Sequence, residues 1–182
     1  MNIYKLLQLN RKIKNHRIKF LGLYLLHRFN QRYFKTLKGQ FKEEELNQVA
    51  KTIFNRALKL QIGCGTEPTL YKDLVKVVEL GKLYKVPYIS ITTNANLLDE
   101  AKIEALLKAG LNEFTISLHG VHKESYENFM QKASYEKFHN AFMAFEKLKK
   151  TYDFKVRINY TFNKDNFYEL ADFFKHFNGA SF

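Results

Sequence analysis

The chain has 182 residues, of which 46% are hydrophobic and 26% are charged, so one domain with a substantial core is expected. Its single cysteine excludes a disulfide scaffold and indicates a reducing, cytoplasmic setting. The longest apolar run, residues 20–26, is far shorter than the roughly 20 residues of a membrane span, and no secretory cleavage pattern is present.

The net charge of +12 is concentrated at the N-terminus. Residues 1–42 hold eleven basic residues and no acidic one, whereas the remainder holds 19 basic and 18 acidic residues. Apolar residues are interleaved with these cations as in a pair of amphipathic helices, so residues 1–41 are predicted to form a basic helical segment. Such a segment suits a helical cover on the rest of the fold, a surface for RNA or another polyanion, or an interfacial membrane anchor.

The next predicted element is a strand at residues 58–62, where apolar residues occupy every second position. The loop that follows, GCGTEP at residues 63–68, has glycines that let a ligand approach the backbone, and Glu67 and Pro68 open a predicted helix. A ligand that carries both an amine and an anionic group would suit this loop. Glycines are also ordinary turn residues, and Glu67 is also favoured as a first-turn acid by the helix dipole.

Further strand-to-helix units follow, each with polar residues where the strand ends. The predicted strands are 88–91, 113–116 and 155–160, and the predicted helices are 99–109, 135–151 and 167–177. The polar residues at the strand ends are Thr92, Thr93 and Asn94, then Ser117 and His119, then Thr161 and Asn163. This alternation predicts an α/β fold with parallel strands, either doubly wound or part of a β/α barrel. In both architectures, ligands bind at the carboxyl ends of the strands.

Arg157 lies inside the last predicted strand and has two interpretations. A guanidinium that points inward from an apolar strand needs an anionic partner, and a ligand carboxylate would serve. An outward-pointing Arg157 would instead pair with an acid on a helix. No metal site is predicted, because His119 and His122 straddle Gly120 in a loop and no third ligand has a recognisable spacing.

The stretches GCGTEPTL, ISITTNANLLDE, AGLNEFTISLHG and KVRINYTFNKDN, in this order and spacing, resemble the radical S-adenosylmethionine (radical SAM) superfamily. The resemblance covers residues 42–177 and points to the branch that forms a partial β/α barrel. It implies a truncated barrel of about four parallel strands over residues 42–182, preceded by the basic segment 1–41.

The resemblance also implies a set of cofactor-binding residues. In the family, the loop that matches residues 63–68 holds the methionine amino group of S-adenosylmethionine, and the strand ends line the cofactor's ribose, its carboxylate and the substrate cavity. The residues that match these positions are Gly63, Gly65, Thr66, Glu67, Pro68, Thr92, Thr93, Asn94, Ser117, His119, Arg157 and Asn159.

The chain departs from the family at the iron–sulfur cluster. Family members hold a [4Fe-4S] cluster with three cysteines in a Cys-x3-Cys-x2-Cys loop after the first strand. Here the only cysteine, Cys64, lies in the second loop and matches none of the three. Residues 32–42 leave no room for the first strand and the cysteine loop, so an internal deletion near Phe34 and Lys35 is expected.

The sequence therefore predicts a radical SAM relative that is inactive in this form because the ligands of its cluster are absent. The alternatives are a non-catalytic nucleoside-binding or scaffold protein, and a polyanion-binding module that acts through residues 1–42. About four strands cannot close a barrel, so open sheet edges are expected at 58–62 and 155–160. Such edges favour a homo-oligomer or a partner that supplies further strands.

Overall fold

The computed structural model describes residues 41–63 and 65–177. The predicted basic segment 1–41 therefore lies outside the described residues, apart from its last residue. The same is true of the expected deletion near Phe34 and Lys35 and of Cys64. The fold below is that of the predicted barrel-like part.

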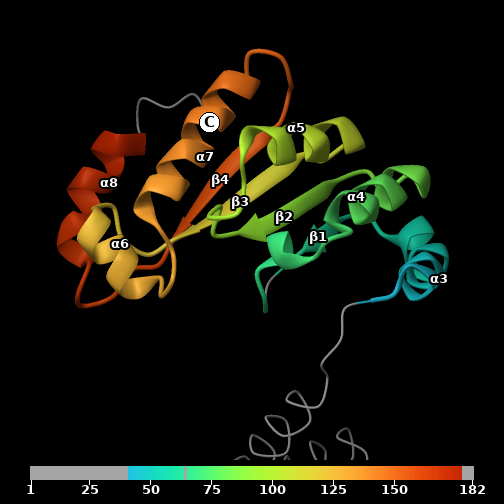
Figure 1. Ribbon diagram of the computed structural model, residues 1–182, viewed down its shortest axis with the longest axis horizontal. Coiled ribbons are helices and arrows are strands. Elements are labelled where there is room, and N and C mark those ends of the chain that lie inside the picture. The colour runs from blue at the N-terminus through green and yellow to red at the C-terminus, as the bar shows by residue number, and fades with distance from the viewer. Residues whose placement is uncertain (1–40, 64, 178–182) are drawn as a thin grey trace, which may run out of the picture. The chain divides into compact units, whose positions relative to one another are not determined.

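A single parallel sheet forms the centre of the described fold. Its strands are β1 (Leu60–Ile62), β2 (Ile89–Thr93), β3 (Glu113–Leu118) and β4 (Lys155–Tyr160), and they lie side by side in sequence order (Figure 1). The bounds of β4 are those predicted, whereas β1 is shorter, because Leu58 is 83% exposed and lies outside the sheet.

Helices connect and flank the strands. They are α3 (Glu43–Ile53), α4 (Leu74–Leu83), α5 (Glu100–Ala109), α6 (Lys123–Phe129), α7 (Tyr135–Leu148) and α8 (Leu170–Phe177), with short 3-10 turns at Phe54–Arg56, Pro68–Leu70 and Phe167–Glu169. The sequence missed α6, which lies in the connection between β3 and α7. Pro68 opens a 3-10 turn and not a full helix. Within the described ranges, no helix is long and apolar enough to cross a membrane.

The ends of α5 show why local sequence sets these boundaries. The Asp99 side chain accepts a hydrogen bond of 2.7 Å from the Lys102 N–H and so caps the first turn. Gly110 takes the left-handed conformation, with φ of 105°, and ends the helix. Both residues occupy the predicted ends of this element.

The crossover helices lie on one face of the sheet. Right-handed connections between strands that follow one another in order place their helices on the same side. Accordingly α3 packs against α4, α4 against α5, and α5 against α7 (Figure 1). The described fold is thus of the barrel type and not doubly wound.

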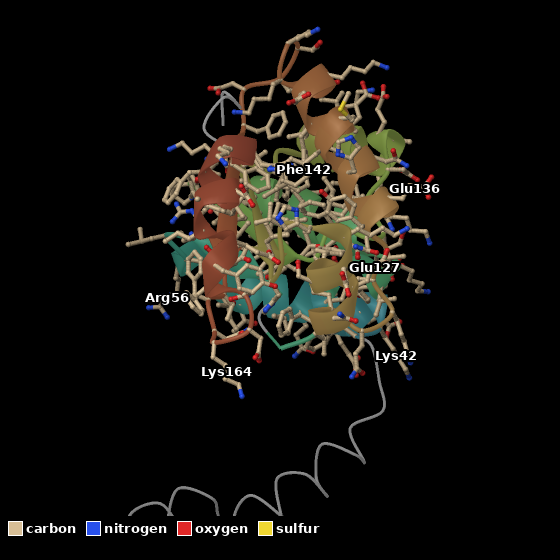
Figure 2. The ribbon with its side chains drawn as sticks, turned by 90° about the vertical axis from the view of Figure 1, so that its left-hand side faces the viewer. Lys42, Arg56, Glu127, Glu136, Phe142 and Lys164 are labelled. Carbon is tan, nitrogen blue, oxygen red and sulfur yellow. The ribbon has the colours of Figure 1, made fainter. Side chains whose placement is uncertain are left out.

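The sheet and its helical layer enclose an aromatic and aliphatic core. Phe145 of α7 is fully buried, with its ring centroid 4.9 Å from that of Phe114 in β3 and 5.9 Å from that of Phe142. Figure 2 shows Phe142 inside the body of the fold, whereas Arg56 and Lys164 project from its periphery. Apolar burial of this kind is the main stabilising term for the sheet and its cover.

The outer edge of β4 leads to a prediction about self-association. Among the described strands none lies beyond β4, and its Lys155 N–H donates inward to the Asn112 carbonyl at 2.8 Å. Because successive N–H groups of a strand alternate in direction, the Arg157 N–H also points inward and the Ile158 N–H points to the open edge. We expect chains to associate through this edge.

Amide hydrogen exchange at low and high protein concentration tests this expectation. The Ile158 N–H should exchange more slowly at high concentration, whereas the Arg157 N–H should be protected at both. Light scattering should report a matching rise in mass. A monomeric chain whose Ile158 exchange does not depend on concentration would contradict the prediction.

Candidate functional site

The glycine-rich loop after β1 is held against the end of β2 by a close backbone contact. Gly63 has φ of 89°, and a Cβ atom built on it would lie 2.5 Å from the Thr92 carbonyl oxygen and 3.1 Å from Pro68. Both observations require glycine at this position. Gly65 has open space around it, so its side of the loop is accessible.

The Glu67 carboxylate joins this loop to β2. Its Oε1 atom accepts hydrogen bonds from the Thr69 N–H at 3.1 Å, the Thr69 hydroxyl at 2.6 Å and the Thr93 hydroxyl at 2.6 Å. Its Oε2 atom accepts one from the Asn94 N–H at 2.8 Å. A carboxylate oxygen has two lone pairs, so Oε1 is saturated and Oε2 keeps capacity for a further donor.

A pocket of about 260 Å³ opens beside this carboxylate at the carboxyl ends of β1, β2 and β3. It is lined by Gly65, Thr66, Glu67, Thr92, Thr93, Asn94 and Ser117. All of these belong to the predicted cofactor-binding set, although they come from three separate strand ends. The parallel register of β1, β2 and β3 brings them together.

The sheet face opposite the helices is polar. The register places Gln61, Ser90, Glu113 and Lys155 in one row, Thr92, Thr115 and Arg157 in the next, and Ser117 beside Asn159 in the last. We call this surface the polar face. Strands of a parallel sheet are usually apolar on both sides, so this face is unusual: it is polar although Ser90, Glu113 and Thr115 are buried.

Glu113 is the buried charge of the polar face. Its side chain is 2% exposed. Its Oε2 atom accepts hydrogen bonds from the Tyr88 hydroxyl at 2.7 Å and from Arg157 Nη2 at 3.1 Å. Its Oε1 atom accepts one from the Thr115 hydroxyl at 2.9 Å. Burial alone would raise the pKa of the Glu113 carboxyl. The hydrogen bonds and the guanidinium charge outweigh burial, so this pKa lies below its ordinary value.

The remaining predicted site residues are not part of the lining of this pocket. Pro68 is buried behind the loop, and Asn159 stands beside Ser117 on the polar face. His119 contributes its carbonyl oxygen, which accepts a hydrogen bond of 2.8 Å from the Asn166 side chain. Arg157 points to the polar face, where it pairs with Glu113 of the neighbouring strand and not with an acid on a helix.

Sequence reasoning missed the cluster that Glu113 forms with Tyr88 and Thr115. From the sequence, Glu113 and Tyr88 are only the first residues of two predicted strands. The signal that could have found them is the alternation itself, because Glu113, Thr115 and Ser117 occupy every second position of one strand. Three polar residues at that spacing predict a polar face.

The donor atoms of the described residues do not fit an iron–sulfur cluster. Nowhere in residues 41–63 and 65–177 do three His, Cys, Asp or Glu side chains gather in a way that could hold a metal ion. His122 already pairs with Asp172, with 3.1 Å between Nε2 and Oδ2. The whole sequence contains one cysteine, whereas cubane clusters need several thiolates.

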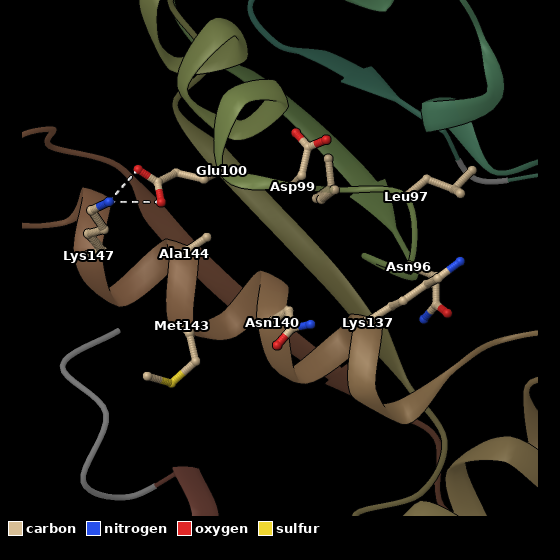
Figure 3. Close-up of a pocket in the computed structure, with 10 residues that line it drawn as sticks. Asn96, Leu97, Asp99, Glu100, Lys137, Asn140, Met143, Ala144 and Lys147 are labelled. Carbon is tan, nitrogen blue, oxygen red and sulfur yellow. Dashed lines mark hydrogen bonds and ion pairs between the residues drawn. The ribbon is translucent and has the colours of Figure 1, made fainter.

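A larger groove of about 670 Å³ lies in the helical layer, between the β2–α5 loop and α7 (Figure 3). Its acids already have protein partners. Asp99 caps α5, and Glu100 pairs with Lys147, with 2.7 Å between Oε1 and Nζ. None of the predicted cofactor-binding residues lines this groove, so the smaller pocket at the strand ends is the candidate site.

Comparison with known proteins gives the family of this fold. The sequence profile described as the Radical SAM superfamily matches residues 7–174. GTP 3',8-cyclase of Aquifex aeolicus is 29% identical over 140 residues, which are 73% of this chain and 42% of that protein. Probable GTP 3',8-cyclase of Methanocaldococcus jannaschii is 30% identical over 132 residues, which are 71% of this chain and 42% of that protein. The chain thus spans less than half the length of these relatives.

Solved structures give the same result for the fold. The structure of anSMEcpe with bound AdoMet and a Kp18Cys peptide aligns with a TM-score of 0.52 and 26% identity, over 68% of this chain and 35% of that one. The structure of anSMEcpe with bound AdoMet alone aligns equally well, with a TM-score of 0.52. The prediction of an α/β partial barrel of this type is confirmed.

The Glu113 cluster generates a prediction about pH and stability. A carboxyl whose pKa is lower in the folded chain stabilises the fold above its unfolded-state pKa of about 4.3, and this stabilisation is lost as the pH falls through the folded pKa. Replacing Arg157 with Met should lower the free energy of unfolding by about 1 kcal/mol at pH 7, a modest value because the Arg157 side chain is 61% exposed to screening solvent.

Urea unfolding from pH 7 to pH 3 measures this effect. The difference between the wild type and Arg157→Met should shrink as Glu113 becomes protonated. Lys164→Met, which removes an exposed cation from the loop after β4, is the matched control and should change stability by less than about 0.5 kcal/mol. A pH-independent loss in Arg157→Met would show that packing and not charge is responsible.

Proposed function

Because this chain belongs to the radical SAM superfamily, we propose that it binds S-adenosylmethionine in the pocket beside Glu67 and that it carries out no radical chemistry in this form. The observation that carries the proposal is the Glu67 carboxylate. Four donors hold it, yet its Oε2 atom accepts only one of them and so keeps a lone pair for a ligand, and Glu67 lines the pocket. A primary ammonium is the ligand group that such an oxygen accepts best.

The chemistry of S-adenosylmethionine matches the rest of the pocket. Its methionine end carries an ammonium and a carboxylate, and its ribose carries two hydroxyls. Gly65 and Thr66 offer backbone groups at the open side of the loop, and Thr92 and Ser117 offer hydroxyls at the strand ends. The binding of one charged end by a rigid, preorganised carboxylate gives orientation as well as affinity.

The size of the pocket indicates which part of the ligand it takes. Its volume of about 260 Å³ lies just under the usual range of about 300 to 1,000 Å³ for small-molecule sites. The pocket therefore suits one end of the molecule. The nucleoside end would extend over the polar face, past Ser117 toward Asn159.

The absence of a cluster donor set supports the proposal that the chain is not an active radical enzyme. A cluster-bound cofactor is normally held and cleaved at an iron atom, and the only cysteine of the chain cannot supply a cubane. A bound nucleoside would then serve recognition or a structural role. The relatives' reaction, GTP 3',8-cyclisation, is not proposed for this chain.

The first prediction from this proposal concerns iron. Anaerobic reconstitution with iron and sulfide should leave the chain without a stoichiometric cluster, because thiolates are the ligands that such clusters select. Iron and sulfide analysis with electron paramagnetic resonance is the measurement. A full cluster in the monomer would refute the idea, whereas a cluster only in a dimer bridged through Cys64 would revise it.

The second prediction concerns Glu67. Without an iron anchor, S-adenosylmethionine should bind weakly, and Glu67→Ala should lower the affinity further, by about tenfold or more, since a hydrogen bond to a charged group contributes about 1.5 to 3 kcal/mol. Isothermal calorimetry measures both. Glu79→Ala, which removes an exposed acid from α4, is the control and should bind like the wild type. Tight binding that survives Glu67→Ala would show that another site holds the ligand.

A further inference from the structure

Thr92 and Thr93 are neighbours in sequence but face opposite sides of the sheet. Thr92 pairs in register with Thr115 on the polar face, and its hydroxyl accepts a hydrogen bond of 2.6 Å from the Gln61 side chain. Thr93 pairs with Ile116, on the side of the helices, and is 2% exposed. The two hydroxyls therefore have different tasks.

The orientation of the Thr93 hydroxyl is fixed from two directions. It accepts a hydrogen bond of 3.0 Å from the Ala95 N–H and lies 2.6 Å from Glu67 Oε1. Because the Ala95 N–H occupies a lone pair and Glu67 can only accept, the hydroxyl proton must point to the carboxylate. Thr93 is thus a permanent donor to Glu67 and not a free hydroxyl of the pocket.

The donors to Glu67 come from two parts of the fold, its own loop and strand β2. Thr69 lies only two residues after Glu67 in the same loop. Its N–H and hydroxyl donors would therefore move together with Glu67. The Thr93 hydroxyl and the Asn94 N–H come from β2 and tie the carboxylate to the sheet. Of these, only the Thr93 hydroxyl belongs to a side chain. Among the described residues, it is the one donor from β2 to Glu67 that a substitution can remove.

We propose that Thr93 is a positioning residue, which ties Oε1 of Glu67 to β2 and so holds the carboxylate where Oε2 can receive a ligand ammonium. The inference rests on the proposed function, because it assumes that Glu67 binds the amino group of S-adenosylmethionine. Thr93 also lines the pocket, but its hydroxyl proton is committed to the carboxylate, so we expect its effect to be confined to the part of the ligand that Glu67 holds.

The test uses two ligands and two variants of the full chain. Thr93→Val removes the donor but keeps the shape of the side chain, and Thr93→Ser keeps the donor. S-adenosylmethionine carries the amino group, and 5'-methylthioadenosine keeps the nucleoside and the S-methyl group but lacks the amino acid portion and the positive charge on sulfur. Calorimetry should show that Thr93→Val weakens binding of S-adenosylmethionine by about tenfold, the loss expected for one hydrogen bond, with no change for 5'-methylthioadenosine. Thr93→Ser should restore the affinity to within about twofold.

The outcomes separate the two ideas. If the wild type binds no S-adenosylmethionine, the proposed function fails. If the wild type binds it and Thr93→Val binds equally well, only the role of Thr93 fails. Equal losses for both ligands would mean that Thr93 has a general structural role and would also overturn the inference.

A second measurement is independent of affinity. The Asn94 N–H donates to the same carboxylate, so its hydrogen exchange reports whether Glu67 stays in place. Exchange at Asn94 should become faster in Thr93→Val and stay at the wild-type rate in Thr93→Ser. An unchanged Asn94 rate in Thr93→Val would show that Glu67 is held without Thr93. Should Thr93→Val fail to fold, Thr93→Ala gives the same comparison.

Discussion

The hydrogen bonds of Glu67 are the constraint on which the candidate site depends. They join a loop after β1 to the end of β2, across 26 positions of sequence to Thr93 and 27 to Asn94. A buried or half-buried carboxylate is stable only when its oxygens are satisfied. Here one oxygen is satisfied by the protein and the other only in part. The site is therefore a place where the fold leaves one acceptor for something else to complete.

The division of the sheet into two faces explains why the site is polar. Strands that follow one another in order, joined by right-handed crossovers, place the helices on one side. Apolar side chains such as Ile91 and Phe114 face that layer, and the alternate positions face away from it. A closed barrel would turn those alternate positions inward. The polar face is accordingly the surface that a barrel interior would present, and its buried carboxylate, Glu113, is paired with Arg157.

Much of this fold could be predicted from the sequence, because its signals are local. Alternation fixed β4, and Asp99 and Gly110 marked the ends of α5 through capping chemistry. The predicted site residues at β1, β2 and β3 do share a pocket. The pairing of Glu113 with Arg157 and the separate tasks of Thr92 and Thr93 could not be read in advance. Each depends on strand register, and a shift of one residue exchanges the two faces.

The burial of Glu113 has a consequence for the order in which the chain acquires its structure. Its ion pair with Arg157 spans 44 positions, so during synthesis β3 leaves the ribosome well before its cationic partner. A carboxylate taken out of water without that partner is destabilising. The early strands therefore gain little stability by pairing without β4. Closing the long loop to β4 brings in Arg157, which offsets the desolvation cost of the Glu113 carboxylate. The sheet is expected to consolidate as one cooperative unit when its last strand docks, and not strand by strand.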